Sequence, residues 1–124
     1  MCEEFKSLPL MESHINFNTL HIFTGGNTEF SKTLLLAFVA EMEIFIAKIL
    51  HDPTEEAFVS FRKSHHSISP SLQMLGLDNI SLAVDDYKAA YANKKEKLSE
   101  KADKLLALSK ASVDEANEWI EKNQ

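Results

Sequence analysis

The stretch that decides the fold is residues 58–75, which read FVSFRKSHHSISPSLQML. Its predicted inward positions recur at steps of three and four, which is the spacing of one face of an α-helix. These positions are Phe58, Phe61, His65, Ile68, Leu72 and Leu75. Thr54 can cap the start of this helix, and Gly76 is well placed to end it. The stretch therefore predicts a long amphipathic helix over residues 54–76.

The same spacing recurs in three other segments, and no segment alternates with the period of two that is typical of a strand. We expect long helices over residues 28–51, 78–93 and 95–122, and a short helical element near residues 17–23. Gly25 and Gly26 interrupt the chain, and Asn27 or Thr28 can cap the helix that follows. Four amphipathic helices with short connections predict an all-α fold, an antiparallel four-helix bundle with a short N-terminal helical element.

The length of 124 residues fits one domain, so we expect a tail over residues 1–13 and a single bundle over residues 14–124. Charged residues interrupt the longest apolar stretch, residues 34–50, which is shorter than the roughly 20 apolar residues of a membrane span. We therefore expect no membrane segment. The single cysteine, Cys2, excludes an internal disulfide and favours a cytoplasmic protein.

The charge and the histidine spacing argue against two further classes of function. Nineteen acidic and 13 basic residues give a net charge of −6, which disfavours nucleic acid as the partner. No two of the five histidines lie four residues apart, so no helix offers a paired metal site. Gly25 and Gly26 are not followed by the lysine of a phosphate-binding loop. We expect neither a metal nor a cofactor.

His66 and His65 are adjacent but are predicted to face different surroundings. At about 100° per residue, His65 lies within about 30° of the centre of the apolar stripe, whereas His66 lies roughly 130° from it. We therefore expect His66 to face solvent. We expect His65 to be largely buried and hydrogen-bonded to a partner in the core.

The surroundings of His66 suit phosphoryl chemistry. A histidine with an ordinary pKa is mostly neutral at pH 7, so its lone pair can attack phosphorus. Arg62 and Lys63 lie one turn before His66, and Ser69 lies one turn after it, where all three can contact a phosphoryl group. From these residues alone, an ordinary surface histidine remains the alternative.

Residues 64–77, SHHSISPSLQMLGL, resemble the signature helix of histidine-containing phosphotransfer (HPt) domains. In that family a glycine lies ten residues after the phosphorylated histidine, and an apolar residue follows it. Here Gly76 lies ten residues after His66, and Leu77 follows. Residues 16–38, NFNTLHIFTGGNTEFSKTLLLAF, are similar to the entry segment of the family. The resemblance extends from residue 16 to about residue 122 and implies a four-helix bundle.

Two positions depart from the family pattern. The lysine that the family has three residues after the histidine is Ser69, and the glycine that it has four residues after is Pro70. Ser69 can donate a hydrogen bond but carries no charge. Pro70 has no N–H to donate to the carbonyl of His66, and it favours a kink. The departures leave the site either retuned or degenerate.

The resemblance implies a phosphorelay intermediate, a phosphocarrier without catalytic activity of its own. A receiver domain of a response regulator or of a hybrid histidine kinase would dock around His66, which would take a phosphoryl group from its aspartate and pass it to another receiver. The receiver would supply Mg²⁺, so no cofactor is expected, and we expect a monomer. The candidate phosphate contacts are Arg62, Lys63 and Ser69. The candidate docking surface is Pro70, Gln73 and Gly76.

Two other interpretations remain open. The chain could keep the HPt scaffold as a degenerate interaction module that binds a receiver or a histidine kinase without phosphotransfer. Ser69 and Pro70 favour this interpretation, and His66 opposes it. The third interpretation is a helical bundle whose likeness to the family is accidental.

Overall fold

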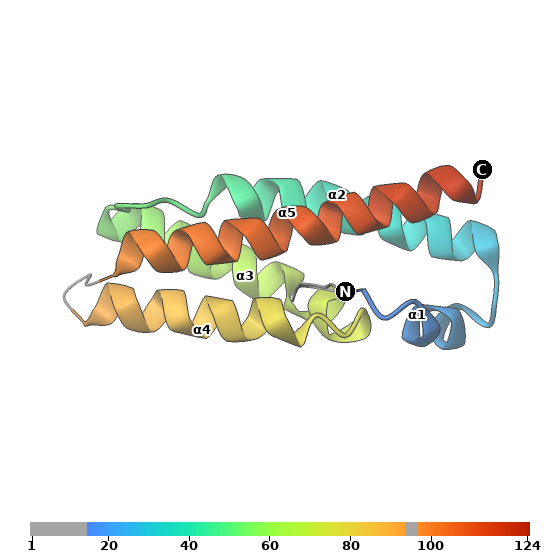
Figure 1. Ribbon diagram of the computed structural model, residues 1–124, viewed down its shortest axis with the longest axis horizontal. Helices are drawn as coiled ribbons and strands as arrows, with labels where there is room; N and C mark the ends of the chain where they lie inside the picture. The colour runs from blue at the N-terminus through green and yellow to red at the C-terminus, as the bar shows by residue number, and fades with distance from the viewer. Residues whose placement is uncertain (1–14, 94–96) are drawn as a thin grey trace, which may run out of the picture.

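The structure is a computed structural model that describes residues 15–93 and 97–124. Within these ranges the chain forms five α-helices and no strand, which confirms the predicted all-α class. The helices are α1 (Phe17–Thr24), α2 (Thr28–Ala47), α3 (Glu55–Met74), α4 (Asp78–Ala92) and α5 (Leu98–Lys122) (Figure 1). The predicted tail over residues 1–13 lies outside the described residues, as do Cys2 and His14.

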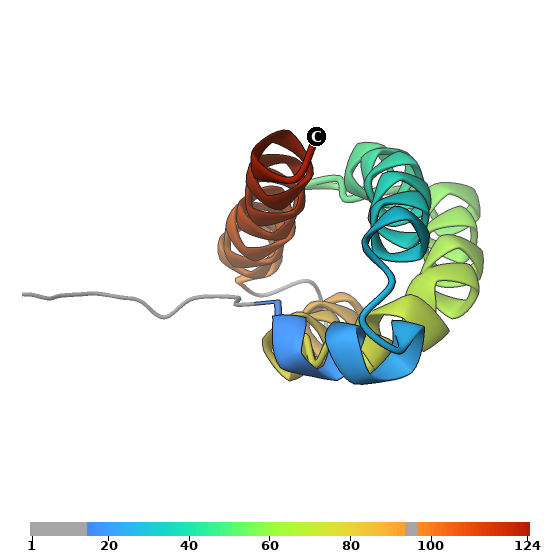
Figure 2. The same ribbon diagram turned by 90° about the vertical axis from the view of Figure 1, so that its right-hand side faces the viewer.

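The four long helices pack side by side. Both α2 and α4 pack against α3 and against α5, so each long helix has two long neighbours. Viewed from the end, α2 to α5 surround a common centre, and α1 lies at the end where α2 begins and α5 finishes (Figure 2). None of the helices in the described ranges is long and apolar enough to cross a membrane.

The core is built from the helical stripes that the sequence predicts. The buried side chains of the core include Phe38, Phe45, Phe58, Phe61 and Leu72. The ring of Phe61 lies edge-on to Tyr87, with 4.8 Å between the centroids, and joins α3 to α4. Such edge-to-face pairs contribute about 0.5–1.5 kcal/mol beyond the area that they bury. This packing fixes the side of α3 that faces solvent.

Side-chain caps start the first two helices, and the cap of the second is one of the two that the sequence predicts. Asn27 accepts the N–H of Phe30 at 2.8 Å and caps α2, and Asn16 accepts the N–H of Thr19 at 3.0 Å and caps α1. Gly25 follows α1 with φ +64°, a left-handed conformation that suits glycine. The Gly-Gly break therefore separates two capped helices.

Two helix ends differ from the prediction. The helix expected to reach residue 51 ends at Ala47, where the N–H of Lys48 donates to the carbonyl of Phe45 in a tighter turn. The Leu50 carbonyl then accepts a hydrogen bond from the Tyr87 hydroxyl at 2.6 Å instead of continuing the helix. The last helix, expected from residue 95, begins at Leu98 because Lys97 is left-handed with φ +61°. Residues 94–96 lie outside the described ranges.

Candidate functional site

Helix α3 carries the candidate site, and local interactions define both of its ends. The Thr54 hydroxyl accepts the N–H of Ala57 at 3.1 Å and caps the helix as predicted. At the other end Gly76 has φ +69°, its N–H donates to the Gln73 carbonyl, and the N–H of Leu77 donates to the Leu72 carbonyl at 2.9 Å. These two bonds form a Schellman motif, the common glycine-dependent end of a helix.

His66 is exposed near the middle of α3, on the outer side that the packing leaves open. Within the described ranges its side chain makes no hydrogen bond and no ion pair. An exposed imidazole without a hydrogen-bonding partner keeps a nitrogen lone pair accessible to a ligand. The helical wheel therefore placed His66 correctly with respect to solvent.

His65 differs in two respects from the expectation. Its side chain is only half-buried, although its Nε2 atom is fully buried and has no hydrogen-bond partner among the described residues. The predicted core partner is thus wrong, because the ring lies against the aromatic ring of Phe45, with 6.2 Å between the centroids. A phenyl ring offers Nε2 neither a conventional donor nor a conventional acceptor.

The surroundings of His65 favour its neutral form. Burial lowers its pKa from the usual value of 6.5, because a charged ring loses hydration in the protein. The nearby cation Lys88 lowers the pKa further, whereas Asp85 raises it and His66 lowers it. Both Lys88 and Asp85 belong to α4.

The two predicted cations of α3 lie differently. Lys63 and Arg62 are both exposed. The guanidinium carbon of Arg62 lies 5.8 Å from the centroid of the Phe58 ring. Phe58 is one turn before Arg62 on α3, whereas His66 is one turn after it, so this contact directs the guanidinium away from His66. This cation–π contact engages Arg62 with an aromatic face. Lys63 has no such contact in the described ranges.

The remaining predicted site residues follow His66 along α3. Ser69 is half-buried, whereas Pro70, Gln73 and Gly76 are exposed. Helical spacing puts Ser69 and Gln73 on the same side of α3 as His66. Pro70 lies inside α3, which continues to Met74. The proline is therefore accommodated in the helix and does not end it.

Sequence reasoning missed the two charges on α4. Lys88 directly follows the inward-facing Tyr87, so the helical wheel alone could have placed it at the edge of α4. The wheel could not show that this edge lies near His65, because the register between α3 and α4 is a tertiary property.

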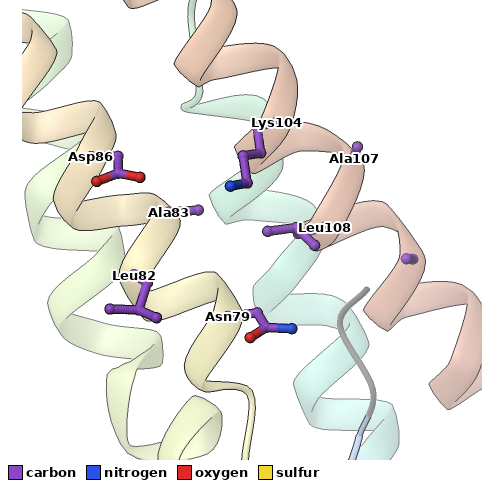
Figure 3. A pocket seen from close by; sticks show the side chains of 8 residues that line it. Asn79, Leu82, Ala83, Asp86, Lys104, Ala107 and Leu108 are labelled. Atoms are coloured by element: carbon purple, nitrogen blue, oxygen red, sulfur yellow. The ribbon is translucent and has the colours of Figure 1, made fainter. Parts of the chain in front are cut away.

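A surface groove lies elsewhere in the described part of the chain. It has a volume of about 490 Å³ between α4 and α5, where Leu82 and Asp86 lie opposite Lys104 and Leu108 (Figure 3). None of the predicted site residues lines it. The groove is lined by residues of α4 and α5, so it is separate from the candidate site on α3.

Comparison with known proteins finds no family model, no curated protein and no solved structure that matches this chain.

Proposed function

We propose that this chain is a phosphoryl carrier of the HPt type, an antiparallel four-helix bundle that accepts a phosphoryl group on His66. The observation that carries the proposal is the contrast between two adjacent histidines. His66 is exposed, whereas the Nε2 atom of His65 is buried. The exposed histidine is also the one that lies ten residues before Gly76, the spacing of the family signature.

The transfer step requires only one nitrogen from this chain. The Nε2 lone pair of His66 attacks the phosphorus of a receiver's phospho-aspartate, and an N–P bond forms as the P–O bond to the carboxylate breaks. The aspartate leaves with the electron pair as a carboxylate. The reverse step, on a second receiver, returns the phosphoryl group to an aspartate. The receiver supplies Mg²⁺ and the positioning residues for both steps.

The partner in this proposal is the receiver domain of a response regulator or of a hybrid histidine kinase. It docks on the exposed side of α3, where Pro70, Gln73 and Gly76 follow His66. The chain then acts as a cytoplasmic, monomeric carrier without catalytic activity of its own. Lys63 and Ser69 are the α3 side chains that remain available to a phosphoryl group, since Arg62 packs on Phe58.

The direct test is incubation with a panel of phosphorylated receiver domains. Phosphohistidine is labile in acid and stable in alkali, so these two treatments identify the product. We expect label on the wild type and on His65→Gln, and none on His66→Gln. His65→Gln is the matched control, because it makes the same change at the adjacent position. Label on His65 in the wild type would contradict the proposal.

A non-catalytic interaction module is the second candidate, and the identities of Ser69 and Pro70 favour it. In this alternative a receiver binds the same face of α3, but His66 is not phosphorylated. Receiver binding by both the wild type and His66→Gln, with no phosphohistidine in either, would support the module and reject the carrier.

A further inference from the structure

The side chains of α3 offer little positive charge to a phosphoryl group on His66. Ser69 is uncharged, and the guanidinium of Arg62 lies over the Phe58 ring in the preceding turn. Lys63 is exposed. Helical spacing turns it about 160° from His65, farther from α4 than His66, which is turned about 100°. A dianionic phosphoryl group on His66 would therefore find little cationic charge on the side of α3 that faces α4.

The register of α3 against α4 is set by aromatic contacts. Phe58 stacks on Tyr91 with 3.9 Å between the centroids, and Phe61 meets Tyr87 at 4.8 Å. From Phe58 to Phe61 the chain of α3 advances by three residues, while the contacted ring on α4 changes from Tyr91 to Tyr87, four residues earlier. The two helices therefore run antiparallel. One turn beyond Phe61, His65 and His66 thus lie opposite the turn of α4 that precedes Tyr87.

Lys88 and His66 lie on the same edge of the seam between α3 and α4, although Lys88 is farther along α4 than the residues directly opposite His66. Lys88 directly follows the buried Tyr87, as His66 directly follows the inward-facing His65, so each is turned about 100° from its inward neighbour. In an antiparallel pair, the same rotation turns both residues toward the same outer edge of the seam. Side chains on a helix also lean toward its N-terminus, which directs Lys88 toward His66.

The electrostatics of the seam agree with this placement. Lys88 lies close enough to the His65 ring to lower the pKa of His65, and Asp85 lies close enough to raise it. Lys88 is half-buried. A half-buried lysine commonly packs its methylene stem against the protein while its ammonium group reaches solvent. Asp85 is exposed and is the acidic group that would oppose an anion at this position.

We infer that the ammonium group of Lys88 contacts the phosphoryl group carried on His66, supplying from α4 the charge that Ser69 does not supply from α3. The inference rests on the proposed function and adds a phosphate-contact residue to it. A flexible lysine stem allows this contact across the seam, and an ammonium group donates charge-assisted hydrogen bonds to phosphoryl oxygens.

Phosphoramidate tests the inference without a receiver. In this reaction the phosphoryl group moves from the donor nitrogen to a ring nitrogen of His66, and the donor nitrogen leaves as ammonia after protonation by water. The variants are Lys88→Met, Lys88→Arg and the control Lys101→Met. Lys101 is also a half-buried helical lysine, but it lies on α5, which packs against α2 and α4.

We expect Lys88→Met to lower the initial rate of phosphorylation at His66 about tenfold or more, the loss expected for a charge-assisted contact. Lys88→Arg should restore most of the rate, and Lys101→Met should match the wild type. An NMR titration gives a second readout that needs no phosphorylation. In it the pKa of His65 should rise in Lys88→Met and stay unchanged in Lys101→Met.

Two outcomes would overturn the inference, and they are distinguishable. Equal rates in Lys88→Met and Lys101→Met, with label on His66, would reject the role of Lys88 and leave the carrier function intact. Absence of label on wild-type His66 from both phosphoramidate and the phosphorylated receivers would reject the carrier function and the role of Lys88 together.

Discussion

Pro70 lies four residues after His66 within α3, so the His66 carbonyl lacks the backbone N–H that a helix would normally direct at it. The helix nevertheless continues to Met74. The residue proposed to carry phosphate thus lies beside a local defect in its own helix.

This relationship predicts that Pro70→Ala stabilises the protein. Alanine restores an N–H donor for the His66 carbonyl and removes the steric conflict of the proline ring. A proline inside a helix costs up to about 3 kcal/mol relative to alanine. Urea unfolding should therefore give a higher free energy of unfolding for Pro70→Ala, with Ser67→Ala, at an exposed position of the same helix, as the control. A decrease would show that the proline fits a bend that the packing requires.

The replacement of Ser69 by lysine tests whether the site is retuned or degenerate. A lysine three residues after His66 adds a charge-assisted contact to phosphate, so Ser69→Lys should raise phosphoryl acceptance from a receiver about tenfold. If the gain appears only when Pro70→Gly is added, the proline is what misplaces His66. No transfer in any variant, with receiver binding retained, would favour the interaction module.

His65 should make stability depend on pH below neutrality. Its pKa is lowered in the folded protein from 6.5, so the unfolded chain binds more protons between the folded value and 6.5. The stabilisation is therefore present above pH 6.5 and is lost as the pH falls through that window. Urea unfolding should be measured as the pH is lowered from 7.5 to 5. Over this range the free energy of unfolding of the wild type should fall relative to that of His65→Leu. Parallel stability curves would contradict this prediction.

The Tyr87 hydroxyl connects α4 to the segment after α2. It donates to the Leu50 carbonyl at 2.6 Å, while the ring packs against Phe58 and Phe61. Tyr87→Phe keeps the ring and removes the hydrogen bond, so the free energy of unfolding should fall by about 0.5–1.5 kcal/mol. An unchanged unfolding midpoint would mean that water replaces the lost donor at the Leu50 carbonyl.

Alanine substitutions at two glycines with similar backbone conformations distinguish the cost of backbone strain from the cost of a steric contact of the added Cβ. Gly76 and Gly25 have φ of +69° and +64°, and a left-handed conformation costs an alanine roughly 1–2 kcal/mol. A Cβ at Gly76 would also lie 3.0 Å from the Cβ of Asn16, whereas one at Gly25 would meet nothing within 4 Å. Gly76→Ala should therefore destabilise the protein more than Gly25→Ala in urea. Equal losses would show that Asn16 moves away freely.

The sequence by itself determined the helices and the faces that they bury. The spacing from Phe58 to Leu75 was sufficient because helical periodicity is a local property of the chain. The same periodicity placed His66 in solvent, and the single glycine at position 76 marked the end of α3. Helix ends that depend on tertiary contacts were predicted less well. Ala47 ends α2 in a segment where the carbonyl of Leu50 bonds to Tyr87, 37 residues away.

Only the tertiary structure decided which groups surround the two histidines. The half-buried position of His65 and its contact with Phe45 depend on how α2 packs against α3. The approach of Lys88 and Asp85 depends on the register that the Phe58–Tyr91 and Phe61–Tyr87 contacts set between α3 and α4. A helical wheel gives the direction of a side chain from its own axis. It carries no information on the neighbouring helix, because register and rotation between helices are fixed by packing across the core.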